Sequence, residues 1–117
     1  MVLFNADKEC DWEDLGEGVS RKIMSYNHDL MVVKVRFEAG SIGKAHQHPH
    51  TQISYVESGV FEYAIGERTE VMVQGDTCII PSKSTHSCRC VEPGVLIDSF
   101  TPMREDFVTQ TPPSYSR

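Results

Sequence analysis

Histidine is concentrated in one short stretch of the chain, HQHPHTQ at residues 46–52. His46, His48, His50 and Gln52 occupy every second position there, although the whole chain has only five histidines. In an extended strand these side chains would share one face, so a hydrated polar face is the simplest interpretation. The alternative is a metal site, because imidazole nitrogen and amide oxygen both bind divalent transition metals.

Two neighbouring features favour the metal site. A glycine-containing segment at residues 40–44 leads into the cluster, and His86 stands at the start of a later strand, after GDTCIIPSKST. Histidines that meet across a barrel would form a rigid set of ligands, as a metal site requires. We expect Pro49 to disturb the strand, so that His50 need not share the face of His48; it is either a further ligand or, as the simpler interpretation, a histidine at the rim.

Short strands, punctuated by glycine and proline, must position these side chains. After an alternating run at residues 30–37 come TQISYVESG, VFEYAIG, TEVMVQG, TCIIP, HSCRCVEPG and VLIDSFTP. A tight hairpin is predicted around residues 66–68, and no stretch has a helical period. This pattern predicts one all-β domain, a sandwich or barrel, over residues 19–108. Residues 1–18 are expected to be irregular and acidic, and residues 109–117 to form a Pro- and Ser-rich tail.

Composition limits the classes of partner and the compartment. A chain of 117 residues with a net charge of −6 supports one modest core and argues against nucleic-acid or anionic-membrane partners. Its longest apolar run, near residues 30–33, is far shorter than the roughly 20 residues of a membrane-spanning helix. We interpret the four cysteines, at positions 10, 78, 88 and 90, as reduced thiols of a cytoplasmic protein.

The spacing of these residues resembles the two motifs of the cupin family. The first motif is matched by Gly40, five residues, His46-Gln47-His48, three residues, Gln52, six residues and Gly59. The second is matched by Gly75, five residues, Pro81-Ser82-Lys83, two residues, His86, three residues and Cys90. Gln52, Lys83 and Cys90 replace the glutamate, glycine and asparagine that are usual in the family. The resemblance implies a single-domain cupin, a double-stranded β-helix or jelly-roll barrel.

The same resemblance implies a divalent transition metal, Zn, Ni, Mn or Fe, held by His46, His48, Gln52 and His86. Three imidazoles suit such ions, and the amide oxygen is a weaker fourth ligand. Because Gln52 is neutral, the ion would keep its full charge and act as a stronger Lewis acid, which favours anionic substrates.

A second informative stretch, VLIDSFTPMREDF, occupies residues 95–107. One interpretation is an edge strand and a surface turn with an Arg104–Asp106 ion pair, which would contribute only about 0–1 kcal/mol. However, strand alternation puts Asp98 on one face with Leu96 and Phe100, and a buried carboxylate usually has a partner or a task. Arg104, six residues further on, could return over the mouth of the barrel.

Together with HPHTQISYVESG, this stretch resembles the KdgF cupins of pectin and alginate degradation. The resemblance implies ring opening of 4,5-unsaturated monouronates to the open-chain 5-keto uronate. It implies Asp98 as the proton-transfer group and Arg104 as the ligand of the carboxylate of an anionic sugar. Phe100 matches an aromatic residue of the same stretch, and Gln47 and Tyr55 are weaker candidates for hydrogen bonds to sugar hydroxyls.

Two other functions stay open on the sequence. A metal-dependent cupin dioxygenase, acting on a flavonol or a β-diketone, would need iron or copper, oxygen and a mostly apolar cavity. A non-catalytic cupin that binds a sugar or a small acid would need a partner protein to act as a sensor. Phe61 and Tyr63 are interpreted as core or dimer-contact residues, and the resemblance to small cupins implies a homodimer.

Overall fold

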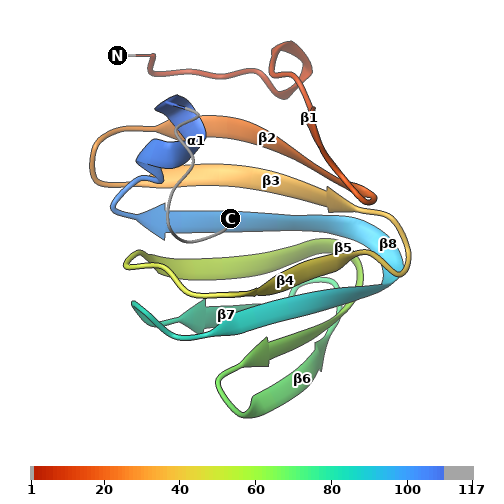
Figure 1. Ribbon diagram of the computed structural model, residues 1–117. Helices are drawn as coiled ribbons and strands as arrows, with labels where there is room; N and C mark the ends of the chain where they lie inside the picture. Colours follow the sequence, from red (N-terminus) through yellow and green to blue (C-terminus); the bar gives the residue numbers. More distant parts are fainter. Residues whose placement is uncertain (1, 110–117) are drawn as a thin grey trace.

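Antiparallel strands form most of the computed structural model, which describes residues 2–109 (Figure 1). The strands are β1 (Glu13–Gly16), β2 (Val19–Tyr26), β3 (Met31–Phe37), β4 (Ile42–His46), β5 (Thr51–Ile65), β6 (Arg68–Met72), β7 (Thr77–Ile80) and β8 (His86–Thr101). Two short helices accompany them, the 3-10 helix η1 (Asp7–Glu9) and α1 (Glu105–Thr109). No helix within residues 2–109 is long and apolar enough to cross a membrane. The predicted all-β fold is confirmed.

Two long strands, β5 and β8, form the spine of the sheet. They pair antiparallel from Thr51 opposite Thr101 at one end to Ile65 opposite His86 at the other. One half of this pair is flanked by β3 and β7, and the other half by β4 and β6. β2 continues the sheet from β3, and β1 follows as its edge. Each long strand therefore belongs to both halves of the barrel.

The pair formed by β5 and β8 bends where Gly59 and Gly94 meet. The register of β5 against β8 shifts between Val56 and Phe61. A Cβ added to Gly94 would lie 2.0 Å from the carbonyl oxygen of Ser58, and Gly59 has a φ of +84°. Neither position tolerates a side chain, so this close approach of two backbones requires glycine. The segments that the sequence separates on either side of these glycines are consequently continuous, bent strands.

Each of the two apolar clusters of the barrel contains a pair of aromatic rings in contact. Phe37 and Phe61 meet edge to face in the larger apolar cluster, with ring centres 5.3 Å apart. In the smaller cluster Phe100 of β8 meets Phe107 of α1 at 5.7 Å. Because α1 has only five residues, its sequence shows no helical period, and the helix was not predicted.

The expected element pattern holds elsewhere with small differences. η1 and β1 lie inside residues 1–18, which were expected to be irregular, and the segment expected as a glycine loop contributes β4. The predicted hairpin is confirmed between β5 and β6, and the four cysteines are free thiols, as predicted. Of the expected tail at residues 109–117, only Thr109 is among the described residues, and it ends α1.

Candidate metal centre

The three histidines of the two sequence motifs meet at one end of the barrel. His46 ends β4 and is the register partner of His86, which begins β8. His48 lies in the irregular segment that contains Pro49, where the strand is interrupted as predicted. Candidate ligand atoms of the three imidazoles all lie within 4.8 Å of one another. The fold therefore brings together side chains that lie far apart in the sequence.

Each of these imidazoles is held by a backbone carbonyl two residues away. The distances from Nδ1 to the carbonyl oxygen are 2.7 Å for His46 and Lys44, 3.1 Å for His48 and His50, and 2.9 Å for His86 and Ser84. A carbonyl oxygen can only accept, so each Nδ1 carries a proton, and in the neutral form of each ring Nε2 then has the lone pair. Such outer hydrogen bonds fix the ring and the tautomer of histidine ligands.

Gln52 joins this set through the orientation of its amide. Its Nε2 donates to Ser54 Oγ at 3.1 Å and to Tyr63 Oη at 3.4 Å, which turns its Oε1 toward His48 Nε2 at 3.0 Å. With the His48 proton on Nδ1, both facing atoms carry lone pairs and neither has a proton to donate. The buried Nε2 of His86 has no hydrogen-bond partner among residues 2–109. A cation bound among these atoms would satisfy all of them.

The donor set therefore fits a divalent transition metal. Three imidazole nitrogens and an amide oxygen suit Zn, Ni, Mn or Fe. Burial lowers the pKa of His48 to about 4, and the positive charge of Arg104 acts in the same direction. Burial and the same charge also lower the pKa of His86. Both imidazoles are thus neutral at pH 7, as metal ligands must be.

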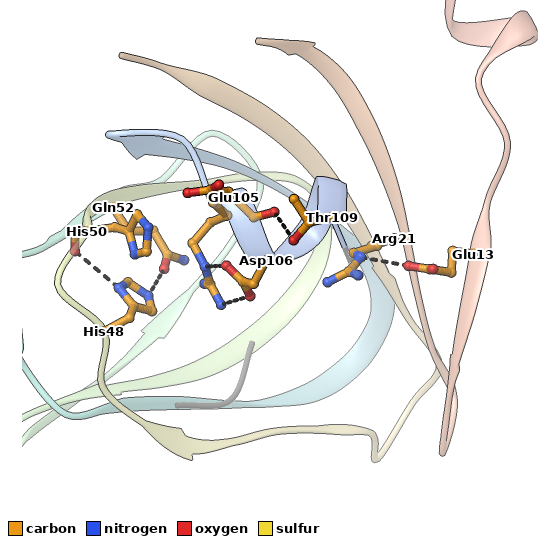
Figure 2. Close-up of polar contacts among 9 residues, drawn as sticks. Glu13, Arg21, His48, His50, Gln52, Glu105, Asp106 and Thr109 are labelled. Carbon is orange, nitrogen blue, oxygen red and sulfur yellow. Dashed lines mark hydrogen bonds and ion pairs between the residues drawn. The ribbon is translucent and has the colours of Figure 1, made fainter. Parts of the chain in front are cut away.

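His50 lies beside this cluster but is not part of it. It is 5% exposed, so the expected position at the rim is wrong. Its ring contacts those of His48 and Phe100, with centres 5.3 and 6.4 Å away. Because its carbonyl accepts the Nδ1 proton of His48, His50 contributes by orienting a ligand (Figure 2).

Asp98 is buried at the predicted place, on the inner face of β8 with Leu96 and Phe100. It lines one cavity of about 70 Å³ together with His46, Gln52 and His86. Burial raises the pKa of Asp98 to about 6, against the hydrogen bonds of Ser54 and Gln52 and the charge of Arg104, which lower it. A carboxyl group with this pKa exchanges a proton readily near neutral pH.

A hydrogen-bonded network under the site escaped the sequence analysis. Ser54 Oγ donates to Asp98 Oδ1 at 2.6 Å and lies 2.8 Å from Tyr63 Oη. Tyr63 was assigned to the core or a dimer contact; it is buried, and its hydroxyl also accepts from Gln52. The available signal was Ser54 itself, a polar residue two positions after Gln52 and hence on the same inward face of the strand.

Arg104 is fully buried and forms the expected ion pair with Asp106, so the pair is confirmed but is not exposed at a surface turn. Its Nε and Nη2 donate to the two carboxylate oxygens of Asp106 at 3.1 and 3.0 Å. Its Cζ lies 4.2 Å from the ring centre of Phe107 and 5.2 Å from that of Phe100. The Arg104 guanidinium group was expected to bind the carboxylate of the substrate, but two of its nitrogens already bind the carboxylate of Asp106.

The weaker candidates divide into one residue inside the site and two outside it. Phe100 lines the cavity and meets the ring of His48 at 5.8 Å. Tyr55 is 40% exposed because strand alternation places it on the opposite face from Gln52. Gln47 is exposed in the segment after β4 and is not among the described residues that line the cavity. The structure does not bring Gln47 and Tyr55 to the site.

The barrel and its histidine cluster define a class of protein. The cupin-domain family matches residues 33–100, so the chain belongs to the cupin family. Within that family it belongs with the KdgF proteins. It is 42% identical to the pectin degradation protein KdgF of Dickeya dadantii (strain 3937) over 92% of this chain and 100% of that protein.

Two solved structures agree with this assignment. KdgF from Halomonas sp. has a TM-score of 0.88 and 37% identity, covering 92% of this chain and 99% of that one. An RmlC-like cupin from Shewanella frigidimarina NCIMB 400 has a TM-score of 0.89 and 37% identity, covering 92% and 96% of the two chains.

Proposed function

We propose that the protein catalyses the metal-dependent ring opening of 4,5-unsaturated monouronates to open-chain 5-keto uronates. One observation carries the proposal: three of the four predicted metal ligands, His46, Gln52 and His86, line the same cavity as Asp98, a buried carboxyl group with a raised pKa. The KdgF relatives, one of which is described as a pectin degradation protein, supply the substrate class.

The reaction is an isomerisation, so it requires proton transfer but no oxidant or reductant. The anomeric hydroxyl loses its proton as the bond between C1 and the ring oxygen breaks, giving an aldehyde at C1 and an enolate over C4, C5 and the former ring oxygen. Protonation at C4 then yields the 5-keto uronate. Asp98 is proposed to accept the first proton and deliver the second, a role that typically contributes ~10²–10⁴-fold. Ser54 donates to Oδ1 of Asp98 and so fixes the orientation of the carboxyl group.

The other residues are proposed to bind the metal ion, to stabilise negative charge and to position the substrate. His46, His48, Gln52 and His86 would hold Zn, Ni, Mn or Fe, which supplies Lewis-acid stabilisation of charge on substrate oxygens when bound. Arg104, fixed by Asp106, is proposed to stabilise the enolate and to assist in binding the anionic substrate. Its charge acts within the site, since it lowers the pKa values of His48 and Asp98.

The test is NMR observation of a 4,5-unsaturated galacturonate with metal-loaded protein, metal-stripped protein and no protein. The control without protein is essential because the ring also opens spontaneously. We expect acceleration only with the metal-loaded protein, and its loss in Asp98→Asn with the metal still bound. Unchanged ring opening in the presence of metal-loaded protein would refute the proposal.

We also propose a cytoplasmic homodimer. Free cysteines support the compartment. An outward apolar row on β5 and β7 supports the dimer, since the register partners Ile53 and Ile79 are 44% and 59% exposed. Light scattering coupled to gel filtration measures the mass directly, and replacement of Ile79 by Lys is expected to shift it toward that of the monomer.

A further inference from the structure

Arg21 is a charged residue on an inward face of the barrel that the sequence analysis did not single out. On β2 it alternates with Val19 and Ile23, which pack in the two apolar clusters. Its side chain is only 12% exposed, and it lines the same cavity as His86 and Asp98. A cation in such a position has lost most of its hydration and requires a compensating partner.

The contacts of Arg21 use only part of its guanidinium group. Nε donates to Glu13 Oε1 at 2.8 Å (Figure 2), and Cζ lies 3.9 Å from the ring centre of Phe107. Among residues 2–109 the guanidinium makes no further hydrogen bond, so both Nη groups are available to a ligand. The Glu13 side chain is 44% exposed, so water screens much of its charge.

Arg104 differs from Arg21 in the hydrogen bonds of its guanidinium group and in the burial of its acidic partner. Its Nε and Nη2 are bound to Asp106, whose side chain is 10% exposed, so its charge is closely neutralised inside the protein. The two arginines share a ring, since Cζ of Arg104 lies 4.2 Å and Cζ of Arg21 3.9 Å from the ring centre of Phe107. Stacking holds the plane of each guanidinium, which favours two-bonded recognition of a carboxylate.

We propose that Arg21 binds the carboxylate of the uronate through its Nη groups and thereby selects acidic over neutral sugars. The inference rests on the proposed function for the class of substrate. Arg21 comes from β2, whereas the predicted metal ligands come from β4, β5, β8 and the segment between β4 and β5. The substrate would therefore be held from two sides, with its acid group at Arg21 and its hydroxyls toward the metal ligands.

The experiment compares the binding of galacturonate and of its neutral methyl ester by titration calorimetry. Neither probe has the 4,5 double bond, so binding is measured without the ring-opening reaction. The proteins are metal-loaded wild type, Arg21→Met, Arg21→Lys and the control Arg36→Met, whose arginine stacks on Trp12 outside this cavity at 4.2 Å. Metal content and the thermal unfolding midpoint are measured for every protein.

We expect Arg21→Met to bind galacturonate ~10- to 100-fold more weakly, the effect of losing charged hydrogen bonds, with binding of the ester unchanged. Arg21→Lys should give an intermediate ratio of acid to ester affinity, because lysine keeps the charge but not the fork. Arg36→Met should match the wild type.

Wild-type galacturonate affinity in Arg21→Met, or an equal loss for acid and ester, would overturn the proposal. If Arg21→Met does not fold, the proposal would be overturned by an Arg21→Lys variant whose ratio of acid to ester affinity equals that of the wild type. Failure of the ring-opening proposal alone would leave the acid preference and its loss in Arg21→Met intact, so the two results are separable.

Discussion

The buried carboxylate of Asp98 should reduce the stability of the metal-free protein at neutral and alkaline pH. Its pKa is about 6 in the folded chain, against 3.8 for an unperturbed aspartate. This difference of about 2 units, at 1.36 kcal/mol each, amounts to about 3 kcal/mol. Because the pKa of Asp98 is higher in the folded chain than in the unfolded chain, the folded chain binds more protons than the unfolded chain between pH 4 and 6. Stability is therefore lost as the pH rises through that window and stays lower above it.

Asp98→Asn removes the charge and keeps an oxygen that can accept the hydrogen bond of Ser54. At pH 8 we expect the metal-free variant to be up to about 3 kcal/mol more stable than the wild type, with the difference shrinking toward pH 4. Urea unfolding of metal-stripped protein at pH 4.5, 6 and 8 measures this, and exposed Asp29→Asn is the control. The metal-loaded variant should nevertheless lose ring-opening activity, typically by ~10²–10⁴-fold.

A variant that is less stable than wild type at pH 8 would refute this reasoning. A stability difference that does not change with pH would refute it as well, because it would show that the charge of the carboxylate is not the cause. Gain of stability with loss of activity is the combination expected of a residue kept for catalysis.

Three further substitutions test the scaffold and the support of the site. Gly94→Ala should cost at least ~1–3 kcal/mol in urea unfolding, because its Cβ would meet backbone at 2.0 Å. Gly16→Ala would meet nothing within 4 Å, so it should cost only the ~1–2 kcal/mol of a side chain at a φ of +86°. Lys83→Gly should raise the unfolding free energy by about 1 kcal/mol, since Lys83 has a φ of +66°. Ser54→Ala should weaken metal binding ~10- to 100-fold in a competition titration, because Gln52 loses a partner that orients its amide; an unchanged affinity would exclude that support.

The sequence predicted the parts of the site that depend on local alternation and motif spacing. Alternation correctly placed Asp98 between two inward apolar residues, and the two motifs placed His46 and His86 in one cluster. For His50 a different argument failed: Pro49 interrupts the strand as expected, but the segment turns that ring inward and not to the rim.

The unpredicted parts depend on contacts between distant segments. The sequence indicates nothing for Arg21 beyond its place in the all-β domain, and only the position of α1 shows that its guanidinium stacks over Phe107 at the cavity. Tyr55 is different, because strand alternation from Gln52 alone places it on the outer face. The two hydrogen bonds from Arg104 to Asp106 likewise depend on the turn that places these two side chains together.

The bent pairing of β5 with β8 also has a consequence for the kinetics of folding. Ser54 and Asp98, bonded across this pair, are 44 residues apart in the chain, so the ladder forms only after a large loop has closed. Of the predicted metal ligands, Gln52 lies on β5 and His86 on β8, so the complete set assembles only when these two strands pair. An ion that binds only this assembled set leaves the rate of folding unchanged and slows the rate of unfolding. Metal loading should therefore lengthen the lifetime of the folded chain without shortening the time it takes to fold.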